Sequence, residues 1–248
     1  MLEFKLRSRA DWKADIKTEQ WVPVETAVII CDMWDAHWCK GATARVAELA
    51  PRINQLVTSL RDKGVLVIHS PSATLKTYTE YPGRKMTLEA PQIDIEAKKI
   101  DLPPHPIDSN DGGCDCVTPC TVHNPWTKQI DCIDIKDEDG IGDDDDVLNL
   151  LTQRGIKNVL IMGVHENMCI IGRPFGIVRL VGVGFKVALV RDLTDVMYNH
   201  RSAPYVDHFT GGDMFTEYIE RYLCPTITSD QVLGGKPFQF NEDKRPRD

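Results

Sequence analysis

The sequence contains no apolar run long enough to cross a membrane, and its N-terminus has no recognisable export signal. No stretch among the 248 residues approaches the roughly 20 apolar residues that a spanning helix needs. The first residues lack the apolar centre of a secretory signal peptide. We therefore expect no membrane partner and a cytoplasmic location, or export if a signal peptide has been removed from the chain.

Positive charge is also scarce. The chain has 29 Lys and Arg against 37 Asp and Glu, which gives a net charge of −8. Such an excess of negative charge disfavours non-specific binding to nucleic acid or to an anionic membrane. We expect no nucleic-acid partner, and a small-molecule substrate instead. The hydrophobic content of 42% is sufficient for one large core.

The eight cysteines are too few, in a chain of this length, for the disulfide scaffold of a small secreted protein. Cys31, Cys132 and Cys224 lie in or beside apolar runs, where cysteine usually serves as a small buried hydrophobe. Cys169 stands alone after an apolar strand. Such a cysteine is predicted to be catalytic only if other reactive side chains lie at the same edge of the sheet.

A second group of cysteines forms the segment CDCVTPC, with Cys114, Cys116 and Cys120. Cys132 and His123 are close to it in the sequence. The CxCxxxC spacing differs from the CxxC spacing of common zinc ribbons, so it is a weak signal for structural zinc. A disulfide is expected if the protein is exported and free thiols if it is cytosolic. The sequence leaves these three alternatives open.

Strand and helix patterns alternate along the chain. Short apolar runs typical of buried parallel strands occur at 26–31, 65–69, 129–135, 159–164 and 186–190. Apolar residues at helical spacing occur at 43–63, 144–154, 168–183 and 214–223, with the third interrupted near Gly172 and Pro174. This alternation predicts a three-layer α/β fold, a doubly wound parallel sheet with helices on both faces.

We expect a single domain over residues 1–248. The pattern lapses between about 70 and 128, which is too long for an ordinary loop. An irregular inserted flap containing a short helix or two is expected there, and an extended C-terminal tail over about 224–248.

Three chemically suggestive residues follow predicted strands. Asp32 comes after the first, Lys136 after the middle one, and Cys169 shortly after the strand at 159–164. Ligands of parallel α/β sheets bind beyond the carboxyl ends of the strands. These three side chains are therefore expected to meet at one edge of the sheet.

The segments CDMWDAH, IKDEDGIGDDDDVLNLL and GVHENMCI resemble the motifs of the isochorismatase-like cysteine hydrolases, the superfamily of nicotinamidases and N-carbamoylsarcosine amidohydrolase. The resemblance covers most of residues 24–223 outside the flap. It implies that Cys169 is the nucleophile, Asp32 its base and Lys136 the cation that stabilises the thiolate. It also implies a cis peptide between Val164 and His165, and an oxyanion hole made by the backbone N–H groups of His165 and Cys169.

The chemistry that the resemblance implies is hydrolysis of a small amide or carbamoyl compound through a thioester, with no cofactor. A free thiol titrates near ~8.5 and needs a base or a nearby positive charge to react at neutral pH. Asp32 can accept the thiol proton and pass it to the leaving amine. Ester or isochorismate-like hydrolysis on the same scaffold, or a non-catalytic ligand-binding relative, are the alternatives. By analogy with the family we expect a homo-oligomer, with the C-terminal tail crossing to a neighbour.

Residues next to these motifs are expected to line the substrate pocket. Trp34, His37 and Trp38 follow the predicted base, and Glu166 and Met168 precede the nucleophile. Two tryptophans and a histidine suit a flat or amphipathic ligand.

Two departures from the family pattern bear on the substrate. Nicotinamidases carry Asp-x-His after the second strand as part of a metal site, whereas here His69 stands alone, so no metal is expected at the active site. Arg173 takes a position where relatives usually have Thr. It is expected either to anchor a substrate carboxylate or to form a structural ion pair.

Overall fold

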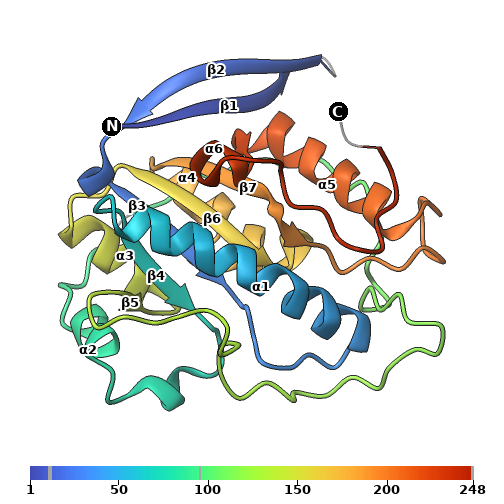
Figure 1. Ribbon diagram of the computed structural model, residues 1–248, viewed down its shortest axis with the longest axis horizontal. Coiled ribbons are helices and arrows are strands. Elements are labelled where there is room, and N and C mark those ends of the chain that lie inside the picture. Colours follow the sequence, from blue (N-terminus) through green and yellow to red (C-terminus); the bar gives the residue numbers. More distant parts are fainter. Residues whose placement is uncertain (11–12, 95, 247–248) are drawn as a thin grey trace.

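The computed structural model describes residues 1–10, 13–94 and 96–246, and these form an eight-stranded sheet in the order β2-β1-β8-β7-β6-β3-β4-β5 (Figure 1). The strands are β1 (Leu2–Ala10), β2 (Lys13–Trp21), β3 (Thr26–Cys31), β4 (Leu66–Ser70), β5 (Gly140–Ile141), β6 (Asn158–Val164), β7 (Lys186–Asp195) and β8 (Thr226–Ile227). The helices are α1 (Lys40–Arg61), α2 (Pro82–Leu88), α3 (Asp144–Gln153), α4 (Ile177–Gly182), α5 (His208–Tyr222) and α6 (Asp230–Leu233).

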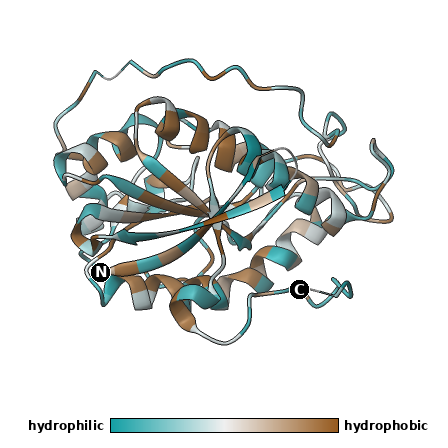
Figure 2. Cartoon of the chain, turned by 90° about the horizontal axis from the view of Figure 1, so that it is seen from above, coloured by the Kyte–Doolittle hydropathy of each residue, from teal (hydrophilic) through white to brown (hydrophobic). Residues whose placement is uncertain are grey.

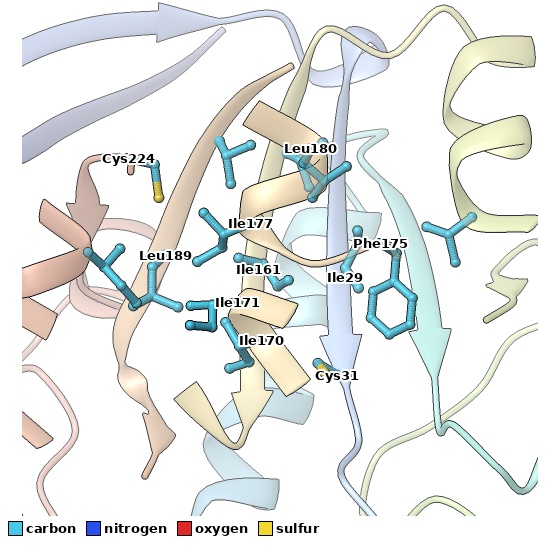
Figure 3. Packing of buried hydrophobic residues seen from close by; sticks show 14 of the residues in the cluster. Ile29, Cys31, Ile161, Ile170, Ile171, Phe175, Ile177, Leu180, Leu189 and Cys224 are labelled. Atoms are coloured by element: carbon cyan, nitrogen blue, oxygen red, sulfur yellow. The ribbon is translucent and has the colours of Figure 1, made fainter. Parts of the chain in front are cut away.

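Every pairing among β3 to β8 is parallel. Alternate residues of β3 enter two separate cores, because successive side chains of a strand point to opposite faces. Ile29 packs on the face covered by α3, α4 and α5, whereas Val28 packs on the face covered by α1. Figure 3 shows the first of these cores, and Figure 2 shows hydrophobic residues concentrated in the central strands. The predicted doubly wound architecture is confirmed.

The N-terminal hairpin of β1 and β2 was not predicted. It adds two antiparallel strands at the edge of the sheet, with Leu2 opposite Trp21 (Figure 1). Leu2, Phe4 and Leu6 alternate with exposed or half-buried neighbours and pack into the α1-side core. β2 is almost entirely exposed. The alternation in β1 is the period-2 signal of a strand with one face in solvent.

The predicted strand at 129–135 is wrong. This segment is a loop that forms one isolated bridge, between Trp34 and Gln129, and then turns through a hydrogen bond from Ile133 N–H to the carbonyl of Ile130. The strand that continues the sheet is β5, a few residues later and only two residues long. Cys132 is consequently exposed and is not the buried hydrophobe that was predicted, whereas Cys31 and Cys224 are buried.

The predicted helix at 168–183 is divided in two. A π-helical turn spans Glu166–Ile170, and α4 begins only at Ile177. The interruption expected near Gly172 and Pro174 is present, and a hydrogen bond from Gly176 N–H to the carbonyl of Arg173 closes the turn between the two pieces.

The flap region contains a 3-10 helix, Leu75–Tyr78, and α2, as expected for that segment. The tail packs against its own chain. Phe238 N–H donates to Asp192 at 2.8 Å, and Arg245 pairs with Asp213 at 2.8 Å. Crossing of the tail to a neighbouring copy stays a prediction. No helix in these described segments is long and apolar enough to cross a membrane.

Candidate active site

The carboxyl ends of β3 and β6 lie side by side, with Cys31 in register with Gly163. Asp32 follows the first strand directly, and His165 follows the second. A side chain at Gly163 would collide with the carbonyl oxygen of Cys31, 2.1 Å from the position of its Cβ, so glycine permits this close approach. The register therefore brings the two strand ends together.

Asp32 is held rigidly at this edge. Its side chain is fully buried, and its Oδ1 accepts a hydrogen bond from Ser72 N–H at 2.7 Å. Its own N–H donates to the carbonyl of Ser70 at 3.0 Å. Its φ of 48° lies in the left-handed region, which residues other than glycine seldom adopt and which recurs at functional sites.

Cys169 reaches Asp32 from the π-helical turn. Besides burial, the negative charge of Asp32 raises the pKa of the Cys169 thiol and the backbone of His165 lowers that pKa, so both groups lie close to the sulfur. The peptide between Val164 and His165 is cis, as the resemblance implied. Of the three side chains expected to meet at this edge, Asp32 and Cys169 lie together.

The prediction for Lys136 is wrong. Its ammonium lies 3.6 Å from Asp134, and half of its side chain is exposed. The prediction placed Lys136 at the end of a strand over residues 129–135, and this segment does not form a strand. The cation beside Asp32 is Arg173, whose Nη2 and Nε lie 3.2 Å and 3.3 Å from Oδ2. Of the two alternatives for Arg173, the structure contains the ion pair.

The electrostatics keep the proton on the sulfur. Burial, followed by the negative charge of Asp32, raises the pKa of Cys169 to about 12, and Arg173 only partly opposes them. Burial also raises the pKa of Asp32, against the lowering by Arg173, Cys169 and Ser72. Cys169 is therefore a neutral thiol beside Asp32 in the resting site, and not the preformed thiolate that the sequence suggested.

Solved structures share this architecture. A cysteine hydrolase from Pseudomonas syringae pv. phaseolicola 1448A superposes with a TM-score of 0.54 at 18% identity, covering 86% of this chain and 94% of that chain. A protein described as an isochorismatase hydrolase from Oleispira antarctica superposes with a TM-score of 0.51 at 13% identity, covering 88% and 100%. No family model matches the sequence, and no curated protein matches it.

The chain has the isochorismatase-like hydrolase fold.

An aromatic wall stands beside the Asp32–Cys169 pair of this isochorismatase-like fold. The ring of Trp34 stacks on that of Trp126 at 4.6 Å, and the ring of His37 lies 5.8 Å from Trp126 and 5.2 Å from Trp38. His37 also meets the ring of His165 edge to face at 5.0 Å. The structure thus brings Trp34, His37 and Trp38 together, and their contact with a substrate stays a prediction.

The side chain of His165 is buried within the same wall. Burial lowers its pKa to about 3, so the ring is neutral at physiological pH. Its Nε2 has no hydrogen-bond partner among the residues that the structure describes. Burial likewise lowers the pKa of His37 to about 4. The wall is therefore uncharged.

Glu166 was predicted to line the substrate pocket, but its side chain points away from the Asp32–Cys169 pair. It is 1% exposed and accepts a hydrogen bond from Thr216 of α5, because the π-helical turn directs it into the interior. Burial raises its pKa well above its ordinary value. Met168 is half-buried and packs beside Cys39 and Cys114, where it supports the wall.

Three residues of this candidate site were missed. Ser72 holds Asp32 through its N–H and donates from its hydroxyl to Asp143 at 3.2 Å. Trp126, at the end of the flap, completes the aromatic wall. No local pattern identifies Ser72 or Asp143, whereas a lone tryptophan in a polar flap was a usable signal for Trp126.

His69 has a structural role at the buried end of β4. Its Nδ1 lies 2.9 Å from Gln129 Oε1 and its Nε2 3.1 Å from Asp139. Asp139 is also bound by Arg61 at 2.7 Å and by the backbone N–H of Lys136 at 2.8 Å. Both ring nitrogens of His69 are therefore committed to protein partners.

Proposed function

We propose that the chain is a cysteine hydrolase that cleaves the C–N bond of a small amide or carbamoyl compound through a thioester on Cys169. The observation that supports it is the closeness of the Cys169 thiol to the buried carboxylate of Asp32, at the place where the backbone of His165 also approaches the sulfur. A nucleophile, a base and a donor for the oxyanion are therefore within reach of one reacting carbon.

The first step transfers the thiol proton to Asp32 as the sulfur attacks the carbonyl carbon. The raised pKa of Asp32, caused by burial, suits this carboxyl to accept a proton and release it later. Arg173 keeps a fixed positive charge beside the pair, because a guanidinium does not lose its proton in proteins. It stabilises the anionic groups and takes no proton itself.

The tetrahedral intermediate carries its negative charge on the former carbonyl oxygen. The N–H of His165, which contacts the sulfur in the resting site, and that of Cys169 are the proposed donors. Collapse of the intermediate breaks the C–N bond, and Asp32 returns its proton to the leaving amine. Water then attacks the thioester, with Asp32 again accepting a proton, and the acid and the free thiol are released.

The wall suggests the shape of the acyl group. Stacked indole rings and a neutral imidazole favour a flat, uncharged group. Because Arg173 is engaged by Asp32, we do not assign it as the anchor of a substrate carboxylate.

The test is a panel of small amides and carbamoyl compounds matched to esters of the same acyl groups. Turnover should be lost in Cys169→Ala and kept in Cys132→Ala, a control at an exposed cysteine. Mass spectrometry of the intact protein should trap an acyl adduct on the wild type and on Cys132→Ala but not on Cys169→Ala. Faster turnover of the esters would favour ester hydrolysis on this scaffold. Binding without turnover or adduct would contradict the hydrolase and indicate a ligand-binding relative.

A further inference from the structure

Cysteines from distant parts of the chain converge beside the active site. Cys39 lies at the N-cap of α1, and Cys114 and Cys116 lie in the flap. Their three sulfur atoms are all within 4.8 Å of one another, and those of Cys39 and Cys116 are 3.8 Å apart. Cys120 packs against the same cluster. Three thiols are therefore close enough to share one metal ion, and a fourth lies beside them.

We propose that Cys39, Cys114, Cys116 and Cys120 bind one structural zinc ion that fastens the flap to the start of α1. The proposal is independent of the hydrolase activity. The sequence alone gave only a weak signal for zinc because Cys39 is far from CDCVTPC along the chain.

The sulfur spacing matches a zinc site. Sulfurs placed about 2.3 Å from a tetrahedral zinc are about 3.8 Å from each other, which is the separation of Cys39 and Cys116. A disulfide would place the two sulfurs about 2.05 Å apart. All eight cysteines, each of them within the described segments, are free thiols.

A backbone N–H group points at one of these sulfurs. Gly41 N–H donates to the sulfur of Cys116 at 3.3 Å. Such a donor stabilises the thiolate that zinc requires, and Gly41 belongs to the positive end of the 22-residue helix α1.

A second layer of charged residues fixes the flap at this place. Asp115, between two of the proposed ligands, accepts from Arg45 at 2.8 Å, and Arg45 also binds Asp195 of β7 at 2.7 Å. Arg201 donates to the carbonyls of Cys114 and Cys116 at 3.3 Å and 3.0 Å. Both arginines offset the negative charge of a four-thiolate site.

The site leads directly to the aromatic wall. Trp38 and Met168 pack against the cluster that contains Cys39 and Cys114. Zinc with four protein ligands has no position for a substrate, so its role here is structural. It holds the flap, Trp38 and Met168 in one arrangement beside the nucleophile Cys169.

The first experiment measures metal in the full chain, purified without chelator from cells grown with Zn²⁺. We expect about one zinc per chain in the wild type and in Cys132→Ser. Cys39→Ser and Cys116→Ser should each retain less than about a fifth of that amount. Wild-type zinc below about a tenth per chain, or equal zinc in all four proteins, would overturn the proposal.

A second measurement does not depend on the folding of the variants. Wild-type protein stripped with a chelator under reducing conditions is titrated with Co²⁺. Tetrahedral thiolate coordination should give intense charge-transfer and d–d bands that saturate at one Co²⁺ per chain and are displaced by Zn²⁺. Absence of these bands would contradict the site. A thiol count of six or fewer of the eight in denaturant with chelator and no reductant would instead indicate disulfides.

Discussion

At the scale of single residues, the position of the positive charge is what most distinguishes this site from the expected one. The resemblance assigned that charge to Lys136, but the guanidinium of Arg173 contacts Asp32. Arg173 arrives from the segment after the nucleophile, one turn beyond Cys169, whose carbonyl accepts its backbone N–H at 3.0 Å.

Removing this cation should impair catalysis. We expect Arg173→Met to lower kcat/KM by about 100-fold, the typical loss when one preorganised charged contact is removed from a transition state. Lys136→Met, the matched control, should change it by less than about twofold, because that side chain is exposed. Steady-state kinetics on the best substrate of the panel provides the measurement. Equal losses in the two variants would restore the role predicted for Lys136.

The reactivity of the sulfur provides a second test. The charge of Asp32 raises the pKa of Cys169, so Asp32→Asn should lower it and increase the thiolate fraction at pH 8. Alkylation of Cys169 by iodoacetamide, followed by peptide mass spectrometry, should be faster in Asp32→Asn than in wild type, about tenfold for each unit by which the pKa falls. Hydrolysis should nevertheless be abolished. Slower or unchanged alkylation would contradict the assigned charge state.

The positions of Asp32 and Cys169 were predictable from sequence, because each follows an apolar run that ends at the same edge of the sheet, whereas the cis peptide before His165 was expected only from the family resemblance. Arg173 was recognised as unusual, but its partner depended on a π-helical turn and a helix break whose geometry no residue pattern specifies. Glu166 was assigned to the wrong side for the same reason: the direction of a side chain in that turn is a tertiary property.

At the scale of elements, one buried carboxylate contributes to the attachment of the N-terminal hairpin, beside its apolar side chains and its pairing with β8. Glu220 of α5, whose side chain is fully buried, binds Arg7 at 2.7 Å and Arg9 at 2.8 Å, both on β1. It also accepts from the hydroxyl of Thr226 in β8. One side chain thus joins the hairpin, the last strand and the helix.

Glu220→Gln should lower the free energy of unfolding by about 2 kcal/mol. The loss of a buried partner costs about 3 to 5 kcal/mol, and we reduce this because Arg7 and Arg9 remain 28% and 16% exposed. Glu217→Gln, at a side chain 39% exposed that pairs with Arg9, should cost less than about 0.5 kcal/mol. Urea denaturation measures both. A difference between the variants of less than their experimental error would remove the assigned role of Glu220.

The parallel strands and the long helices were predictable because their hydrophobic patterns are continuous. β5 and β8, each two residues long, have no pattern to detect. The segment 129–135 was predicted as a strand because a partly buried loop with several apolar residues has the same composition as a strand. Its Gln129, 3% exposed, is held by the hydroxyl of Tyr78, a contact 51 residues away in sequence.

At the scale of the whole molecule, stability should depend on pH through His165. Its pKa is lowered to about 3 by burial, below the value of about 6.5 of an unfolded histidine. The contribution of neutral His165 to the free energy of unfolding is therefore complete above pH 6.5 and is lost as the pH falls toward 3. Between pH 7 and pH 5 the free energy of unfolding should fall by about 2 kcal/mol. Almost all of this fall occurs in the roughly 1.5 pH units below the unfolded pKa of about 6.5, at about 1.36 kcal/mol for each unit.

The matched variant is His165→Phe, which keeps the backbone N–H and an aromatic ring against His37. His37 and His208 titrate in both proteins, and the raised pKa of His208 acts in the opposite direction as the pH falls. We therefore compare the two proteins. The wild type should lose about 2 kcal/mol more than the variant between pH 7 and pH 5. Equal losses in urea titrations would contradict a neutral His165.

The neutral sulfur of Cys169 also affects how the protein withstands oxidants. Peroxide converts thiolates to sulfenic acid readily and leaves protonated thiols largely untouched. A thiol whose pKa is raised to about 12 therefore persists in reduced form. In the mechanism that we propose, deprotonation coincides with the attack on a bound acyl group, so the substrate itself would determine when the sulfur becomes vulnerable.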